Sequence, residues 1–164
     1  MSIRFGILTL SDRSAKGERQ DASGPALADL VRAQGWSVAK QVILPDDEST
    51  IRTALIEWAD SGEVDIILTT GGTGFAPRDI TPEATRAVIE RDAPGLAEFM
   101  RAESLKKTPH AMLSRAVAGI RGRTLIVNLP GSPKGALENM QTILPVLPHA
   151  VQLLTGDPGS EASH

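Results

Sequence analysis

The sequence predicts an α/β fold built on a mostly parallel sheet with helices on both faces. Short apolar runs alternate with longer segments whose apolar residues recur three or four positions apart, as expected of strands and amphipathic helices in turn. Strand–helix–strand units join parallel strands, and their right-handed crossovers place helices on both faces of the sheet. A length of 164 residues and an apolar fraction of 41% suit one globular domain.

The first half of the chain is expected to alternate strands and helices. The strands are short apolar or alternating runs, and the helices carry apolar residues at helical spacing. Gly35 and Gly62 each end a helix, and Pro45 ends a strand. In chain order the segments are strand Ile3–Leu10, polar loop Ser11–Ser23, helix Gly24–Gln34, strand Trp36–Leu44, helix Glu48–Ser61 and strand Val64–Thr70.

Proline residues divide the second half. Thr81 is expected to cap a helix with Pro82 at its first helical position, and Pro94 ends that segment. Pro145 and Pro148 are expected to kink or divide a long final helix. In chain order the segments are a helix from Thr81, helix Gly95–Leu105, strands Met112–Gly119 and Thr124–Leu129, and helix Pro133–Leu154.

Residues 1–156 are expected to form one domain, because no linker or internal repeat interrupts the alternation. Residues 157–164 are small and polar, and we expect a disordered tail there. The apolar run Phe5–Leu10 is too short for a signal-peptide core or a membrane span. We therefore expect a cytoplasmic protein that does not insert into a membrane.

Composition excludes several functional classes. Cysteine is absent, which excludes disulfides, thiolate metal sites and cysteine nucleophiles. A net charge of −3 would not attract nucleic acid, and aromatic residues at 3%, with no tyrosine, leave little for base stacking. His110, His149 and His164 are too scattered to suggest a metal site or a Ser–His–acid triad.

Polar and glycine-containing loops follow the predicted strands. Open α/β sheets bind ligands in a crevice at the carboxyl ends of their strands, so we expect these loops to border one crevice. The residues concerned are Ser11 and Asp12 after Leu10, Asp46 after Leu44 and Pro45, Gly71 after Thr70, and Gly131 after Leu129 and Pro130.

Gly71, Gly72, Thr73 and Gly74 form a glycine-rich turn after the third strand. Such a turn lets backbone N–H groups approach a phosphate, and the acid that follows favours phosphate binding over a merely tight turn. Asp79 would repel the same phosphate unless a cation lay between them, which indicates Mg²⁺. Asp79 could equally cap the following helix. The loop matches neither the Walker A sequence nor the Gly-x-Gly-x-x-Gly pattern.

A second set of acids follows the second strand. Asp46 could be a turn residue, a helix cap or a metal ligand. Asp47 and Glu48 are expected to serve the N-terminus of the next helix. Asp46 and Asp79, on separate strand-end loops, would together suit a metal shared with triphosphate oxygens.

The segment Asn128–Lys134 is the other unusual cluster. It could be a proline-rich helix entry, but Ser132 and Lys134 would also be available to an anion, and we favour that functional role. Other polar residues could either contact substrate or serve only as loop and strand residues: Ser11, Asp12, Ser114 and Arg115.

Taken together, these motifs resemble the molybdopterin adenylyltransferase type of molybdenum-cofactor biosynthesis proteins, a family that includes the gephyrin G-domain. The resemblance runs from Ile3 to about Leu154, nearly the whole chain. The combination is specific, whereas Gly-Gly-Thr-Gly alone is shared with related molybdopterin-binding domains. The matching segments are Thr70–Gly74, Pro77–Ala84, Leu113–Arg115 and Asn128–Lys134.

The resemblance implies a three-layer α/β/α sandwich that usually assembles as a homotrimer, with hexamers in one branch. It implies that ATP and molybdopterin react to give adenylyl-molybdopterin and pyrophosphate, and that a molybdenum insertase receives the product. The catalytic aspartates of the family fall on Asp46 and Asp79, and its pterin-site serine and asparagine on Ser114 and Asn128. The same ligand region takes in Pro130, Gly131, Ser132 and Lys134.

The chain departs from the longest family members in one place. The segment between Lys134 and Val151 is short, as in a sister branch in which some members lack adenylylation activity. Both aspartates and the Arg78–Glu83 motif are retained, so we favour the active enzyme. The alternatives are a molybdopterin carrier or scaffold without this activity, and a nucleotide pyrophosphatase.

Overall fold

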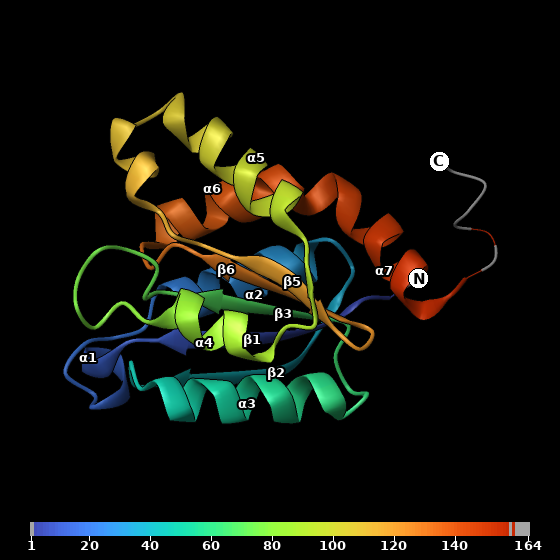
Figure 1. Cartoon of the computed structure of the whole chain (residues 1–164), viewed down its shortest axis with the longest axis horizontal. Coiled ribbons are helices and arrows are strands. Elements are labelled where there is room, and N and C mark those ends of the chain that lie inside the picture. Colours follow the sequence, from blue (N-terminus) through green and yellow to red (C-terminus); the bar gives the residue numbers. More distant parts are fainter. Residues whose placement is uncertain (1, 158, 160–164) are drawn as a thin grey trace.

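The computed structural model describes residues 2–157 and residue 159. Across these residues the strands form one six-stranded sheet, which Figure 1 shows between two layers of helices. The strands are β1 (Arg4–Leu10), β2 (Ser37–Leu44), β3 (Ile66–Thr70), β4 (Arg91–Asp92), β5 (Ala118–Arg121) and β6 (Thr124–Leu129). Their order in the sheet is β2-β1-β3-β6-β5-β4.

The sheet is parallel at its centre and antiparallel at one edge. β1 pairs in parallel with β2 and β3, and β3 pairs in parallel with β6. β5 is antiparallel to β6, and β4 is antiparallel to β5. The predicted α/β class with a mostly parallel sheet is confirmed. Most of the predicted tail, residues 157–164, lies outside the described residues.

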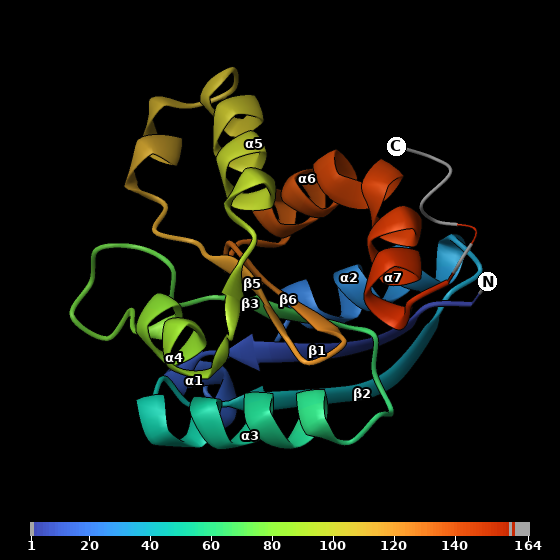
Figure 2. The same ribbon diagram turned by 45° about the vertical axis from the view of Figure 1, so that its right-hand side comes forward.

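Helices cover both faces of the sheet, as the crossovers require. Figures 1 and 2 show α5, α6 and α7 on one side of the sheet and α3 and α4 on the other. The helical segments are α1 (Asp12–Ala15), α2 (Ser23–Ala33), α3 (Glu48–Asp60), α4 (Thr81–Val88), α5 (Pro94–Leu105), the 3₁₀ turn η1 (Pro109–Leu113), α6 (Pro133–Ile143), the 3₁₀ turn η2 (Leu144–Val146) and α7 (Leu147–Thr155). The predicted three-layer sandwich is confirmed.

Two hydrophobic cores lie on opposite faces of the sheet because neighbouring residues of a strand point to opposite sides. Ile7 belongs to the core under α2, α5, α6 and α7, whereas Leu8 belongs to the core under α3 and α4. Leu68 and Ile67 divide in the same way. β3 is buried along its whole length, which fits a central strand covered on both faces.

Three local expectations were wrong. The loop after β1 contains α1, whose cap is the Ser11 hydroxyl, accepting from the Ser14 N–H. Thr81 does not cap α4, because it is the first helical residue and its buried hydroxyl donates to the Gly71 carbonyl at 2.9 Å. The predicted strand Met112–Gly119 is η1 followed by an extended connection, and β5 begins only at Ala118.

The expected division of the last helix is confirmed, since η2 separates α6 from α7 next to the two prolines. Asp47 is the cap of α3, as expected, and accepts from the Thr50 N–H at 2.9 Å.

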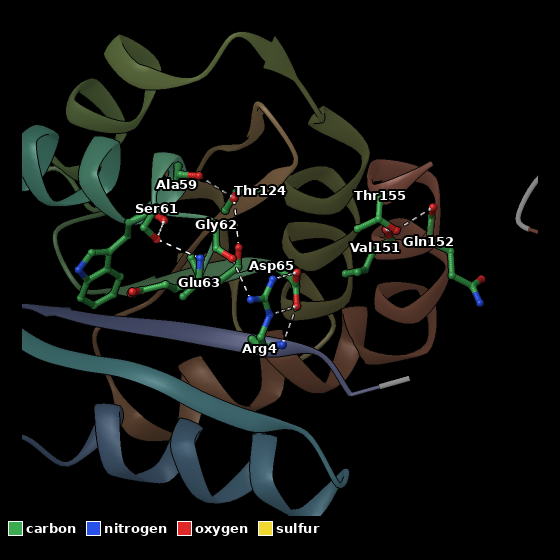
Figure 3. Close-up of polar contacts among 12 residues, drawn as sticks. Arg4, Ala59, Ser61, Gly62, Glu63, Asp65, Thr124, Val151, Gln152 and Thr155 are labelled. Carbon is green, nitrogen blue, oxygen red and sulfur yellow. Dashed lines mark hydrogen bonds and ion pairs between the residues drawn. The ribbon is translucent and has the colours of Figure 1, made fainter. Parts of the chain in front are cut away.

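A polar cluster joins β1 and β3 at the end of the sheet opposite their carboxyl ends (Figure 3). Asp65 accepts from the Arg4 backbone N–H at 2.8 Å and from the guanidinium at 2.9 Å and 3.2 Å. Burial alone would raise the pKa of Asp65, but the hydrogen bonds from Arg4 outweigh it and hold this pKa below its usual value. The cluster therefore fixes the start of both strands by a charged pair.

Candidate active site

The loops at the carboxyl ends of the parallel strands surround one pocket of about 330 Å³. The strand register brings these ends level, since Leu10 lies opposite Leu44 and Thr70 lies opposite Leu129. Residues from all four strand-end loops line the pocket, as the sequence predicted; they include Ser11, Asp46, Gly71, Gly72, Asp79, Gly131 and Ser132.

Glycines allow the loops to approach one another closely. Gly71 has φ +106°, and a Cβ there would collide with the Leu10 carbonyl. A Cβ on Gly131 would lie 3.3 Å from the Gly71 Cα, tighter than an ordinary contact. The ends of β1, β3 and β6 can therefore meet around the pocket only because these positions lack side chains.

Not every amide of the glycine-rich turn is available to a ligand. The Gly71 N–H donates to the Leu129 carbonyl at 3.1 Å. The amides of Gly72, Thr73 and Gly74 make no hydrogen bond within the described part of the chain. The turn can therefore offer these three N–H groups to an anion.

Asp46 lines the same pocket, and one of its carboxylate oxygens lacks a hydrogen-bond partner among the described residues. Its Oδ2 accepts from the Asp12 backbone N–H at 3.1 Å, whereas Oδ1 is buried and has no hydrogen-bond partner among the described residues. Burial raises the pKa of Asp46, and the charges of Asp12 and Asp79 add to this effect. A buried carboxylate oxygen without a partner is costly in a folded protein, so a donor or a cation that reached Oδ1 would be bound favourably.

Asp79 is held by its own loop. Its Oδ2 accepts from the Ala76 N–H at 2.9 Å, and its backbone N–H donates to the Ala76 carbonyl at 2.9 Å. Ile80 occupies the cap position of α4 and makes no side-chain capping bond. The alternative in which Asp79 caps that helix is therefore wrong, and Asp79 instead lines the pocket.

Two arginines on the pocket wall escaped the sequence analysis. Arg19 and Arg78 both line the pocket, and within the described residues neither guanidinium has an ion pair or a hydrogen bond. Arg78 is close enough to act on the Asp46 carboxylate, where its charge opposes the effect of burial on the pKa. The position of Arg78 directly before Asp79, in the Arg78–Glu83 motif, could have identified it as a site residue. No feature of the sequence around Arg19 pointed to the pocket.

A second pocket of about 330 Å³ lies on the other side of the glycine-rich turn. Ser114 and Pro130 line it, together with Thr73 and Gly74 of the turn. Ser132 is the residue that lines both pockets, and its hydroxyl also caps α6 by accepting from the Gly135 N–H at 3.1 Å. Arg101, Lys107 and His110 provide basic groups around this second space.

Three predicted site residues lie outside both pockets. Asn128 is fully buried: its amide donates to Thr69 and Thr85 at 2.9 Å each and accepts from the Val117 N–H at 3.0 Å. Lys134 is exposed on α6, and Asp12 lies behind Asp46, where it accepts from the Asp46 N–H at 2.8 Å. The geometry gives Asn128 and Asp12 supporting positions behind the pockets.

The acids fit a divalent cation only if a ligand contributes oxygens as well. Within residues 2–157 no group of three His, Asp or Glu side chains is close enough to hold a metal alone. Asp46 and Asp79 face the same pocket, and the unpartnered Asp46 Oδ1 provides a free hard donor there. Mg²⁺ is typically bound in this way, by one or two carboxylates together with substrate phosphates.

Comparisons with known proteins agree on one family. A family described as "Probable molybdopterin binding domain" matches residues 6–149. The molybdopterin adenylyltransferase of Helicobacter pylori strain J99 is 42% identical over 158 residues, which cover 95% of this chain and 90% of that protein. The molybdenum cofactor synthesis protein cinnamon of Drosophila melanogaster is 49% identical over 160 residues, but the chain spans only 26% of its length.

Solved structures give the same result. The crystal structure of the molybdopterin biosynthesis enzyme MoaB from Thermus thermophilus superimposes with a TM-score of 0.89 at 55% identity. The match covers 95% of this chain and 98% of the other. The resemblance that the sequence motifs indicated is confirmed.

Proposed function

Because the chain belongs to the molybdopterin-binding domain family of molybdenum-cofactor biosynthesis proteins, we propose that it is a molybdopterin adenylyltransferase. The reaction transfers AMP from ATP to the terminal phosphate of molybdopterin and releases pyrophosphate. The observation that carries the proposal is a pair of pockets that share Ser132. One of them holds a buried carboxylate oxygen and two guanidinium groups, none of which has a partner among the described residues.

The pocket with Asp46 and Asp79 would hold the triphosphate. Of the three unbonded amides in the turn, that of Gly72 belongs to a residue lining this pocket and would donate to a phosphate oxygen, while Thr73 and Gly74 line the second pocket. Arg19 and Arg78 add positive charge at the wall of the first pocket. Asp46 and Asp79 would hold Mg²⁺ between themselves and the phosphates. When bound, the cation supplies charge neutralisation on the triphosphate.

The second pocket would hold molybdopterin. Ser114 and Ser132 offer hydroxyl groups there, and the backbone at Pro130 forms part of its wall. Because Ser132 borders both spaces, molybdopterin in the second pocket would direct its terminal phosphate past Ser132 towards the first pocket. Asn128 would act indirectly in this arrangement, by fixing the strand end that carries the Pro-Gly-Ser-Pro loop.

The transfer itself needs little acid–base assistance. An oxygen of the molybdopterin phosphate already carries negative charge and forms the new bond to the α-phosphorus of ATP. The bond between the α-phosphorus and the bridging oxygen breaks, and pyrophosphate leaves with that electron pair. The main task of the protein is to place two anions in line and to offset their repulsion, and one preorganised donor can contribute about 3–4 kcal/mol to such a barrier.

A pyrophosphate-release assay with ATP, Mg²⁺ and molybdopterin tests this function. We expect pyrophosphate and adenylyl-molybdopterin in equal amounts, and we expect Asp79→Asn to retain molybdopterin affinity while losing most turnover.

Molybdopterin binding without pyrophosphate release would indicate the carrier or scaffold instead. Cleavage of a dinucleotide without molybdopterin would indicate a nucleotide pyrophosphatase. Unchanged turnover in Asp79→Asn would contradict the role given to that residue.

The assembly and cellular setting stay predictions of the resemblance: a homotrimer, or a hexamer as in one branch, that works in the cytoplasm and passes its product to a molybdenum insertase. Light scattering on the purified chain tests the first of these. Among the described residues, no helix has the length and apolar character needed to cross a membrane.

A further inference from the structure

Arg115 is a residue next to the second pocket that the proposed function does not use. It follows Ser114, which lines the second pocket, and it precedes β5. Its backbone N–H donates to the Thr73 carbonyl at 2.8 Å, so the chain at Arg115 runs directly against the glycine-rich turn.

The Arg115 guanidinium clamps the loop that carries Asp79. Its Nε donates to the Gly74 carbonyl at 2.8 Å, and its Nη2 donates to the Asp79 carbonyl at 2.6 Å. These carbonyls stand at the start and at the end of the segment 74–79. One rigid planar group therefore sets the distance between the two ends of this segment.

An ion pair with Glu83 orients the same guanidinium. Nη1 donates to Glu83 Oε2 at 2.7 Å, and Nη2 donates to Oε1 at 3.1 Å, a bidentate geometry. Glu83 lies in the first turn of α4, and the loop enters this helix directly after Asp79. The guanidinium thus connects three parts of the chain: the loop 74–79, α4 and the extended segment that contains Ser114.

We propose that Arg115 is a positioning residue for adenylyl transfer. By holding the loop 74–79, Arg115 fixes the position of the Asp79 carboxylate in the pocket that would hold the metal and the triphosphate. This inference rests on the proposed function. The Arg115 side chain lines neither of the two substrate pockets, so it acts through the loop and not on the substrates. Loss of the clamp leaves the Asp79 carboxylate present but free to move with residues 74–79.

Arg121 provides a matched control. Its guanidinium also makes a bidentate pair, with Asp60 at 3.0 Å and 3.1 Å, and donates to one carbonyl, that of Val88, at 3.0 Å. It lines neither substrate pocket. Arg115→Gln and Arg121→Gln therefore remove similar interactions, but only the first lies against the Asp79 loop.

The test compares these two variants with Arg115→Lys and Glu83→Gln. In Arg115→Gln we expect kcat to fall at least tenfold and the half-saturating Mg²⁺ concentration to rise at least threefold, with KM for molybdopterin within twofold of wild type. Arg115→Lys, which keeps the charge but not the planar fork, should show the same direction of change. Glu83→Gln, which keeps both carbonyl contacts, should show smaller changes.

Added guanidinium ion at millimolar concentration should restore part of the turnover lost in Arg115→Gln. Arg121→Gln should leave all kinetic values unchanged.

Amide hydrogen exchange on the free proteins gives a readout that does not depend on activity. We expect faster exchange across residues 74–80 in Arg115→Gln, and none of this change in Arg121→Gln. Equal kinetics for wild type and Arg115→Gln, or a loss of turnover without any change in Mg²⁺ dependence or loop exchange, would overturn the proposal. If wild type itself transfers no AMP, the proposed function fails, and loop exchange alone then decides whether Arg115 is a clamp.

Discussion

Asp12 and Asp46 exchange hydrogen bonds across the carboxyl ends of β1 and β2. The Asp46 N–H donates to Asp12 Oδ1 at 2.8 Å, and the Asp12 N–H donates to Asp46 Oδ2 at 3.1 Å. This reciprocal pair fixes the rotamer of Asp46 and leaves its Oδ1 buried without a partner among the described residues. The fold therefore holds a carboxylate in a place where it is costly unless a ligand arrives.

The first prediction concerns the stability cost of Asp46. We expect Asp46→Asn to raise the melting temperature of the ligand-free protein by a few degrees, because it removes the charge of a carboxylate whose Oδ1 is buried without a partner among the described residues. In a domain of this size about 1 kcal/mol shifts Tm by roughly 2–4 °C. The same variant should lose most adenylyl transfer. A lower Tm, or wild-type turnover, measured by calorimetry and by pyrophosphate release, would contradict the role of this carboxylate.

The second prediction concerns Gly72, whose φ is +69°. A Cβ there would collide with Thr81 Oγ1 and lie 3.2 Å from Asp46 Oδ1. Gly72→Ala should therefore destabilise the protein by more than the cost of the left-handed backbone alone, about 1–2 kcal/mol, and should abolish turnover.

Gly35→Ala is the matched control, because Gly35 has φ +81° and a Cβ there would meet nothing within 4 Å. It should show only the backbone cost in urea denaturation and keep full activity. If the two variants lose the same stability and both remain active, the close approach at Gly72 has no functional importance.

The third prediction concerns Arg78, an exposed residue on the wall of the pocket that Asp46 and Asp79 also line, the one proposed to hold the triphosphate. Arg78→Gln should raise KM for ATP by about tenfold, the equivalent of roughly 1.4 kcal/mol, and make that KM less sensitive to salt. Arg123→Gln removes another exposed charge, in the turn between β5 and β6, and should change neither value. Identical salt dependence of KM in wild type and Arg78→Gln would show that this charge does not contact the nucleotide.

The fourth prediction concerns pH and the Arg4–Asp65 pair at the opposite end of the sheet. Because the pKa of Asp65 is lowered in the folded protein, its ionised form stabilises the fold at neutral pH. This contribution is complete above about pH 4, the ordinary carboxyl value, and is lost as the pH falls through the lowered pKa. Asp65→Asn should cost about 1–3 kcal/mol at pH 7 and progressively less below about pH 4.

Urea denaturation of wild type and Asp65→Asn across this pH range measures the difference. Turnover at neutral pH should be unaffected below the melting temperature, since the pair is remote from both pockets. A stability difference between wild type and Asp65→Asn that grows as the pH falls would contradict a lowered pKa of Asp65 in the folded protein.

The convergence of the strand-end loops was predictable because it follows from topology. Once alternating strands and helices indicate a parallel sheet, the residues after each strand must share one edge, and Asp46 and Gly72 do meet there. Asp47 as a helix cap was also predictable, because capping depends on neighbours in sequence. Local and topological rules therefore located the pocket that Asp46 and Asp79 line.

The roles of Asn128 and Arg115 were not predictable from sequence. Asn128 contacts Thr85, 43 positions away, and Arg115 contacts the Asp79 carbonyl, 36 positions away. Neither contact can be deduced from the spacing of residues within one helix or strand, because each depends on how the helices pack on the sheet. The error at Met112–Gly119 has a related cause: these residues look like a strand, but only from Ala118 onward do they have a strand to pair with.

In the proposed function, a divalent cation joins ATP to Asp46 and Asp79. Isothermal titration calorimetry of ATP into the wild-type protein, with Mg²⁺ and with EDTA, tests it most directly when Asp46→Asn/Asp79→Asn is titrated in parallel. We expect binding that requires Mg²⁺ in the wild type and loss of that requirement in the double variant. Equal ATP affinity with and without Mg²⁺ in folded wild-type protein would contradict the account.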